Sequence, residues 1–197
     1  MSLIPKKITC IGRNYVEHIQ ELGNAMPDEM VIFNKPPSCI SKTLIAQHQG
    51  ETLHYEGELC FVIENNRPVA VGFALDLTKR GMQSKLKEKG LPWERAKSFD
   101  GAIVASDFVA IEQADISSLS LKLFIDGNLV QHGHSSHMIY PVQVAIDELA
   151  LWQQLQNGDW LLSGTPKGVG EVKSGQVFEG QVLLNETVIV SAKWQAQ

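Results

Sequence analysis

The 197-residue chain is 44% hydrophobic and carries a formal net charge of −5. A chain of this length and apolar content can form one globular domain with a sizeable core, so we expect residues 1–197 to be a single domain. The lysines and arginines are mostly scattered and leave no basic surface for a phosphate backbone, which argues against a nucleic-acid partner.

The three cysteines, Cys10, Cys39 and Cys60, stand far apart in apolar surroundings. This spacing is typical of reduced core cysteines in a cytoplasmic protein rather than of a disulfide framework. Residues 1–7 contain no apolar targeting core, and no apolar run approaches the ~20 residues that cross a bilayer. We therefore expect a cytoplasmic protein without a membrane partner.

The amino-terminal part predicts a strand over residues 8–11 that leads into a helix over residues 16–22. Asn14 is a suitable cap for that helix. His18 and Glu21 are three residues apart, so the carboxylate can orient or charge the imidazole on one helix face. An ordinary surface pair would have the same spacing.

A second short strand is expected over residues 30–33. Pro36 restricts the backbone of the residue before it, so Lys35 lies on an extended or turned segment. From there the lysine can reach into a site or lie in solvent.

The strand expected over residues 54–63 carries Glu56 and Glu58 on one face, because strand side chains alternate. A hairpin with the strand at residues 69–76 puts Asp76 opposite Glu56. Like charges opposite one another destabilise a sheet, so three converging carboxylates favour a hard divalent cation with oxygen ligands. A solvated acidic face is the alternative.

The next segment predicts a helix over residues 78–89 that ends at Gly90. Arg80 and Gln83 face back from this helix toward the acids. Lys97 follows in a mixed segment, where it is either a buried ammonium beside a metal site or a surface lysine with a buried stem.

The second half returns to strands, expected over residues 103–111 and 121–130, with a hairpin turn at residues 126–128. Residues 141–154 predict an amphipathic helix. Its expected apolar face consists of Val142, Val144, Ala145, Ile146, Leu149 and Trp152.

Two further segments carry polar groups. His132 and His134 share a strand face with His137 nearby, but no third ligand is well placed, which argues against a zinc site. The glycine-rich loop at residues 163–170 lacks the phosphate-binding P-loop pattern. Its N–H groups and the Thr165 hydroxyl could instead receive a small carboxylate.

Taken in order, these pieces resemble the fumarylacetoacetate hydrolase family, specifically its short single-domain members that act on acylpyruvates, oxaloacetate and related 2-oxo acids. The resemblance covers nearly the whole chain. Its motifs are Gly12-Arg13-Asn14-Tyr15 with His18 and Glu21, Glu56-x-Glu58, Asp76, Leu91-Pro92-Trp93, Ala96-Lys97-Ser98-Phe99, and residues 163–170.

The resemblance implies an α+β fold that is mainly β, the family's mixed β-sandwich roll with a few short helices, in a homodimer. The implied cofactor is Mg²⁺ or Mn²⁺, with the ligands Glu56, Glu58 and Asp76. The implied catalytic residues are His18, Glu21 and Lys97. The implied substrate-binding residues are Arg13, Gln83 and Thr165.

For the activity, the first hypothesis is a metal-dependent hydrolase that cleaves a C–C bond in acylpyruvate-like 2,4-dioxo acids through a metal-stabilised enolate. In it, His18 activates water and Lys97 steadies negative charge. The second is an oxaloacetate decarboxylase or keto–enol tautomerase. The third is a non-catalytic metal or oxo-acid binding module, because Lys79-Arg80-Gly81 departs from the usual family segment. All three take a small 2-oxo acid as partner.

Overall fold

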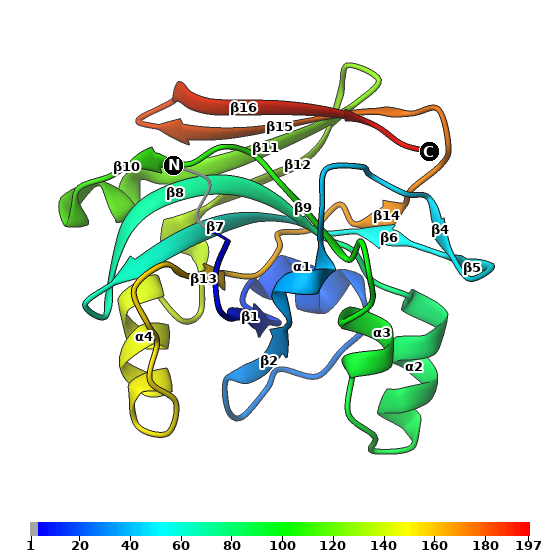
Figure 1. The fold of residues 1–197 in the computed structure, drawn as a ribbon, viewed down its shortest axis with the longest axis horizontal. Coiled ribbons are helices and arrows are strands. Elements are labelled where there is room, and N and C mark those ends of the chain that lie inside the picture. The colour runs from blue at the N-terminus through cyan, green and yellow to red at the C-terminus, as the bar shows by residue number, and fades with distance from the viewer. Residues whose placement is uncertain (1–3) are drawn as a thin grey trace.

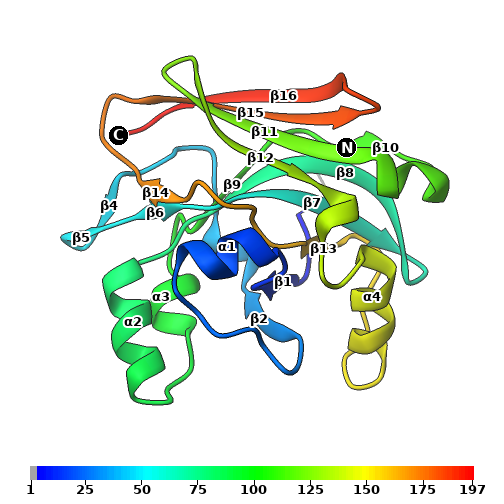
Figure 2. The same cartoon turned by 180° about the vertical axis from the view of Figure 1, so that it is seen from behind.

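Two β-sheets stack on each other in the computed structural model, and the α-helices lie on the side of the larger sheet away from the smaller one (Figure 1; from behind in Figure 2). The structure describes residues 4–197, so the first part of the segment expected to lack a targeting core lies outside the described residues. No helix in residues 4–197 is long and apolar enough to cross a membrane.

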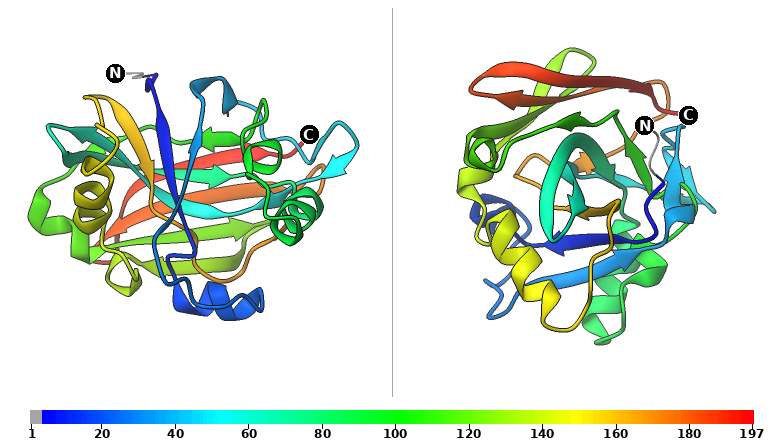
Figure 3. Two further views of the ribbon diagram at one scale, coloured as in Figure 1. Left: turned by 90° about the horizontal axis from the view of Figure 1, so that it is seen from below. Right: turned by 60° about the vertical axis from the view of Figure 1, so that its left-hand side comes forward.

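The larger sheet is mixed, because β1 pairs in parallel with β13 and β3 in parallel with β9. It curls strongly along β8, as Figure 3 shows. Its strands, in spatial order, are β2 (Val31–Lys35), β1 (Ile8–Gly12), β13 (Asp159–Leu162), β7 (Gly57–Glu64), β8 (Arg67–Asp76), β9 (Ile103–Ala105) and β3 (Ile40–Ser41), with β10 (Val109–Ala110) paired to β8.

The smaller sheet is antiparallel and packs over β7 and β8. Its strands, in spatial order, are β12 (Asn128–His134), β11 (Leu119–Ile125), β15 (Val177–Leu184) and β16 (Thr187–Gln195). Two short pairs complete the strands: β4 (Gln47–His48) with β5 (Glu51–Thr52), and β6 (His54–Tyr55) with β14 (Gly170–Glu171).

The helices of residues 4–197 are all short. The α-helices are α1 (Val16–Glu21), α2 (Arg80–Glu88), α3 (Glu94–Lys97) and α4 (Val142–Ala150). Single 3₁₀ segments cover Pro37–Cys39, Gln113–Ser118 and Ser135–His137. With 42% strand and 21% helix, the chain confirms the expected mainly β fold with a few short helices.

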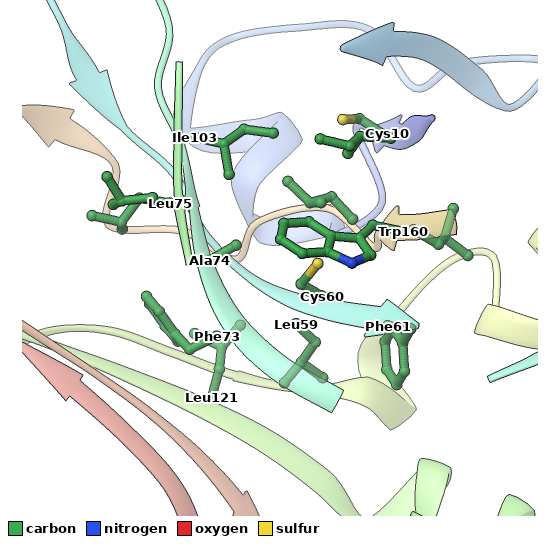
Figure 4. Close-up of a cluster of buried hydrophobic side chains, with 14 of the residues drawn as sticks. Cys10, Leu59, Cys60, Phe61, Phe73, Ala74, Leu75, Ile103, Leu121 and Trp160 are labelled. Carbon is green, nitrogen blue, oxygen red and sulfur yellow. The ribbon is translucent and has the colours of Figure 1, made fainter. Parts of the chain in front are cut away.

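The core between the sheets is built by one face of the β7–β8 hairpin. Leu59 pairs directly with Phe73, and both side chains point toward Leu121 of β11 (Figure 4). Gly180 of β15 leaves room for the Phe73 ring, because a Cβ atom at this position would lie 2.2 Å from that ring. The alternate residues of β7, Glu58 and Cys60, therefore face the other side of the sheet.

Several local expectations have clear outcomes. Cys10, Cys39 and Cys60 are buried and free, which confirms the prediction of core cysteines. The helix end at Gly90 is also confirmed, since this glycine has a φ of +62°. The long helix expected over residues 141–154 is wrong at its carboxyl end, because α4 stops at Ala150.

The predicted apolar face of that helix is also partly wrong. Val144 is 48% exposed and Trp152 is 58% exposed, so neither belongs to the core. Val144 lies on the solvent side of the helix, and Trp152 lies beyond its last turn. The four buried residues of the helix are Val142, Ala145, Ile146 and Leu149.

Candidate active site

Three carboxylates meet where β7 and β8 pair. Gly57 pairs with Leu75, and the Asp76 amide donates to the Glu56 carbonyl at 2.8 Å, so Asp76 lies opposite Glu56 as the sequence predicts. One carboxylate oxygen from each of Glu56, Glu58 and Asp76 lies within 4.8 Å of the others. All three residues are buried, with 6%, 2% and 0% of their surface exposed.

A β-bulge creates this register. The tight turn pairs Glu64 with Arg67. If this pairing register continued along both strands, Asp76 would lie on the opposite face of the sheet from Glu56. The register shifts by one residue between Val62 and Ile63, which brings Asp76 to the same face. The bulge is therefore what makes the three carboxylates converge.

Lys97 lies buried among these acids. Its Nζ donates to Glu56 Oε2 at 2.8 Å, to Asp76 Oδ2 at 2.8 Å and to Thr78 Oγ1 at 2.6 Å. Burial alone would lower the pKa of the Lys97 ammonium, but Asp76 and Glu56 raise it above its ordinary value. The surface-lysine alternative is thus wrong, and Lys97 is a permanently charged group of the site.

Two more cations reach the carboxylates. Lys35 is 1% exposed, and its Nζ lies 2.6 Å from Asp76 Oδ1 while it donates to the carbonyls of Leu77 and Ala102. Arg80 forms an ion pair with Glu56 through Nη2. The sequence left open whether Lys35 reaches a site. The prediction that Arg80 faces the acids is confirmed, although the sequence assigned it no role in the site.

Glu58 differs from the other two acids, because it has no lysine or arginine ion-pair partner among residues 4–197. Its Oε2 accepts a hydrogen bond from the Gly164 amide at 2.8 Å. Burial, and then Asp76 and Glu56, raise the pKa of Glu58 well above its ordinary value. A hard divalent cation would relieve this cost, so the all-oxygen donor set fits Mg²⁺ or Mn²⁺.

His18 and Glu21 form the expected pair on α1. His18 Nδ1 lies 3.4 Å from Glu21 Oε2, and Glu21 Oε1 accepts a hydrogen bond from the Gly168 amide at 2.9 Å. Burial lowers the pKa of His18, although the charge of Glu56 and the hydrogen bond from the imidazole to Glu21 oppose the shift. The imidazole is therefore neutral at pH 7 and can accept a proton.

The expected capping role of Asn14 is wrong. Tyr15 occupies the position before α1 and makes no side-chain cap bond. Asn14 instead donates to the carbonyls of Tyr140 and Ser163, at 3.0 and 2.8 Å, and accepts from the Tyr140 amide at 2.7 Å. It thus ties the start of α1 to the loop after β13 and to the segment before α4.

The glycine-rich loop holds carboxylates of the chain itself. The amides of Gly164 and Gly168 donate hydrogen bonds to Glu58 and Glu21, respectively. The sequence suggested that loop amides could bind a ligand carboxylate, but these two are already occupied by side chains of the protein. Thr165 is 3% exposed, and its Oγ1 donates to the Gly57 carbonyl at 2.9 Å. The loop therefore positions both the acids and the histidine pair.

One cavity of about 40 Å³ joins these groups. Every predicted site residue except Glu21 lines it; the set is Arg13, His18, Glu56, Glu58, Asp76, Gln83, Lys97 and Thr165. Arg80 and Lys87 line it as well, and Arg80 Nη1 donates to Gln83 Oε1 at 2.8 Å. The cavity has an acidic inner part and a basic outer part, which suits an anionic ligand that also contacts a cation.

The comparison with protein families decides the kind of protein. The model of the fumarylacetoacetate (FAA) hydrolase C-terminal family matches residues 7–193. The chain belongs to this family. The resemblance noted in the sequence is thereby confirmed, and the curled mixed sheet is the expected fold.

Relatives within the fumarylacetoacetate hydrolase family cover most of the chain. Oxaloacetate tautomerase YcgM of Escherichia coli (strain K12) is 34% identical over 197 residues, covering 90% of each chain. Mitochondrial oxaloacetate tautomerase FAHD1 of Homo sapiens is 37% identical over 193 residues, covering 90% of this chain and 87% of that protein.

A solved family structure shows what a similar fold can bind. Fumarylpyruvate hydrolase from Pseudomonas aeruginosa, in complex with Mn²⁺ and pyruvate, is 25% identical with a TM-score of 0.86. The match covers 98% of this chain and 89% of that one. This chain is therefore a member of an enzyme family whose named relatives act on small oxo acids.

Proposed function

We propose that this protein is a divalent-metal-dependent enzyme that interconverts the keto and enol forms of oxaloacetate or a similar small 2-oxo dicarboxylic acid. The observation that carries the proposal is a neutral His18 on the wall of a small cavity whose inner part holds three buried carboxylates. The relatives named oxaloacetate tautomerase support the same choice.

The outer part of the cavity suits a dicarboxylate. Burial lowers the pKa of Lys87, and Arg13 and Arg80 lower it further, so three positive charges repel one another there. A substrate carboxylate beside them would relieve the repulsion. Arg13, Arg80 and Lys87 line the cavity beside the acids, so they suit the second carboxylate that oxaloacetate carries and acetylpyruvate lacks.

A cation held by Glu56, Glu58 and Asp76 would polarise the keto oxygen of the substrate and favour loss of a C3 proton. Tautomerisation moves one proton from C3 to the oxygen on C2. Neutral His18 accepts the C3 proton, Glu21 stabilises the resulting imidazolium, and the imidazolium returns a proton to the oxygen. Lys97 holds Glu56 and Asp76 in place, and its charge lowers the pKa of Glu56.

Hydrolysis of an acylpyruvate is the second candidate, and the sequence alone put it first. The fumarylpyruvate hydrolase with Mn²⁺ and pyruvate supports it. The more similar relatives named oxaloacetate tautomerase reverse the order. Decarboxylation of oxaloacetate breaks the C3–C4 bond as CO₂ leaves, and the electrons of that bond form an enolate between C3 and the keto oxygen. Tautomerisation passes through the same kind of enolate and would use the same cation, so decarboxylation belongs with the first candidate.

The test compares three reactions in one preparation. Purified protein is stripped with EDTA, reloaded with Mg²⁺ or Mn²⁺, and assayed for oxaloacetate enol–keto exchange, pyruvate formation from oxaloacetate, and cleavage of acetylpyruvate. We expect exchange to have the highest kcat/KM and to depend on the metal. A higher kcat/KM for acetylpyruvate would refute the proposal in favour of the hydrolase. Light scattering of the same sample tests the proposed homodimer.

A further inference from the structure

A second group of metal-ligating side chains lies on the smaller sheet. His132, His134 and Glu186 each offer one ligand atom, and these atoms lie within 4.8 Å of one another. The two imidazole rings are 4.7 Å apart, centroid to centroid. No third ligand for the histidines could be recognised in the sequence, because Glu186 is far away along the chain.

The strand register explains how the group forms. On β12 and β11, His132 pairs with Lys122 and His134 pairs with Ser120, so all four side chains share one face of the sheet. This is the outer face, because Leu121 between them points into the core.

Glu186 belongs to a different hairpin from the two histidines. It lies in the tight turn between β15 and β16, where Asn185 and Glu186 have φ values of 48° and 64°. The Asn185 amide donates to the Ser118 carbonyl at 3.3 Å, which holds the turn against the start of β11. The Glu186 side chain can therefore extend over β11 toward the histidines.

Ser120 provides an independent observation at the same place. It is 1% exposed, and its Oγ has no hydrogen-bond partner among residues 4–197. A buried hydroxyl without a partner is costly. Because Ser120 lies directly opposite His134 on the same face, its hydroxyl is placed to bond a ligand or water held by these side chains.

We propose that His132, His134 and Glu186 form a binding site for Zn²⁺ or a similar transition-metal ion, separate from the three-carboxylate site. Two imidazole nitrogens and one carboxylate oxygen suit Zn²⁺, with a fourth position left for water. The three-carboxylate site offers only oxygen and suits harder cations.

The charge state of His132 agrees with this geometry. Burial, and then His134 and Lys122, lower the pKa of His132, so its imidazole is neutral at pH 7, the form that binds metal. Lys122 competes with the ion, because its Nζ lies 3.3 Å from Glu186 Oε2. Glu186 is 63% exposed on its side chain and free to turn from the lysine to a metal.

The experiment uses the full chain saturated with Mg²⁺ and adds Zn²⁺ in a calorimeter and Cu²⁺ in an EPR tube. We expect one Zn²⁺ per chain at this site and nitrogen coupling in the Cu²⁺ spectrum. The double variant His132→Gln/His134→Gln should lose that coupling and bind Zn²⁺ at least about 100-fold more weakly, beyond the usual effect of losing an outer-shell partner.

Two further variants sharpen the test. Lys122→Met should tighten Zn²⁺ binding, because it removes the competing cation beside Glu186. The matched control His48→Gln, which changes a histidine outside both sites, should leave Zn²⁺ binding and the Cu²⁺ spectrum unchanged. Wild-type binding or unchanged nitrogen coupling in the double variant would overturn the proposal, and so would weaker binding in Lys122→Met.

Discussion

Replacing Lys35 with methionine tests whether buried cations organise the acids. The change leaves Asp76 Oδ1 without the Nζ that lies 2.6 Å away. Removing one partner of a buried ion pair costs about 3–5 kcal/mol. Asp76 keeps Lys97 at 2.8 Å, so we expect the lower end, about 3 kcal/mol, or a Tm lowered by about 6–12 °C.

Mg²⁺ should act differently on the variant and the wild type. Without Lys35, Asp76 loses a cation that competes with the metal, so Mg²⁺ should bind Lys35→Met more tightly. Because a ligand stabilises the state that binds it, a fixed Mg²⁺ concentration should then raise the Tm of the variant more than that of the wild type.

The assay is urea or thermal unfolding in EDTA and in excess Mg²⁺. Lys193→Met is the matched control, since Lys193 forms an exposed ion pair with Glu179 at 2.9 Å, and such pairs contribute about 0–1 kcal/mol. A loss below about 1 kcal/mol in Lys35→Met, or a smaller Mg²⁺ shift than in the wild type, would refute this account of the site.

Three other predictions concern the acids, the base and the buried ammonium. Mg²⁺ at 100 times its Kd should stabilise the wild type by about 2.7 kcal/mol, and Glu58→Gln should lose this shift; equal melting in EDTA and Mg²⁺ would contradict the metal site. His18→Ala should lower tautomerisation about 100-fold or more. Burial lowers the pKa of His18 below 6.5, and only neutral imidazole accepts the proton. The wild-type rate should therefore rise with pH through a pKa below 6.5 and then level off. A pH profile that His18→Ala leaves unchanged would exclude this base. Lys97→Met should lower turnover about 100-fold even in saturating Mg²⁺, and turnover equal to that of the wild type would show that the ammonium has no part in the reaction.

The periodicities of strand and helix were readable from the sequence because they are local. Alternation along the strand predicted that Glu56 and Glu58 share a face, and both line the cavity. Helical spacing predicted that His18 and Glu21 meet, and their atoms lie 3.4 Å apart. Neither relation depends on what packs around the element.

The carboxylate register was predicted correctly, but its physical cause was not visible in the sequence. The turn at Asn65 and Asn66, with φ values of 50° and 55°, is a two-residue turn that would leave Asp76 on the wrong face. The bulge between Val62 and Ile63 corrects this. A bulge depends on pairing across the sheet, so the sequence of one strand does not reveal it.

The sequence by itself determined most of the elements, the two acids on one side of an extended segment and the histidine pair on one helix, because each follows from the geometry of a single segment. Only the tertiary structure decided which distant side chains join them. Lys35 reaches Asp76 from β2, and Asn14 bonds across to Ser163 instead of capping its own helix. Glu186 likewise meets His132 only through the packing of two hairpins, since such contacts depend on where whole elements lie in space.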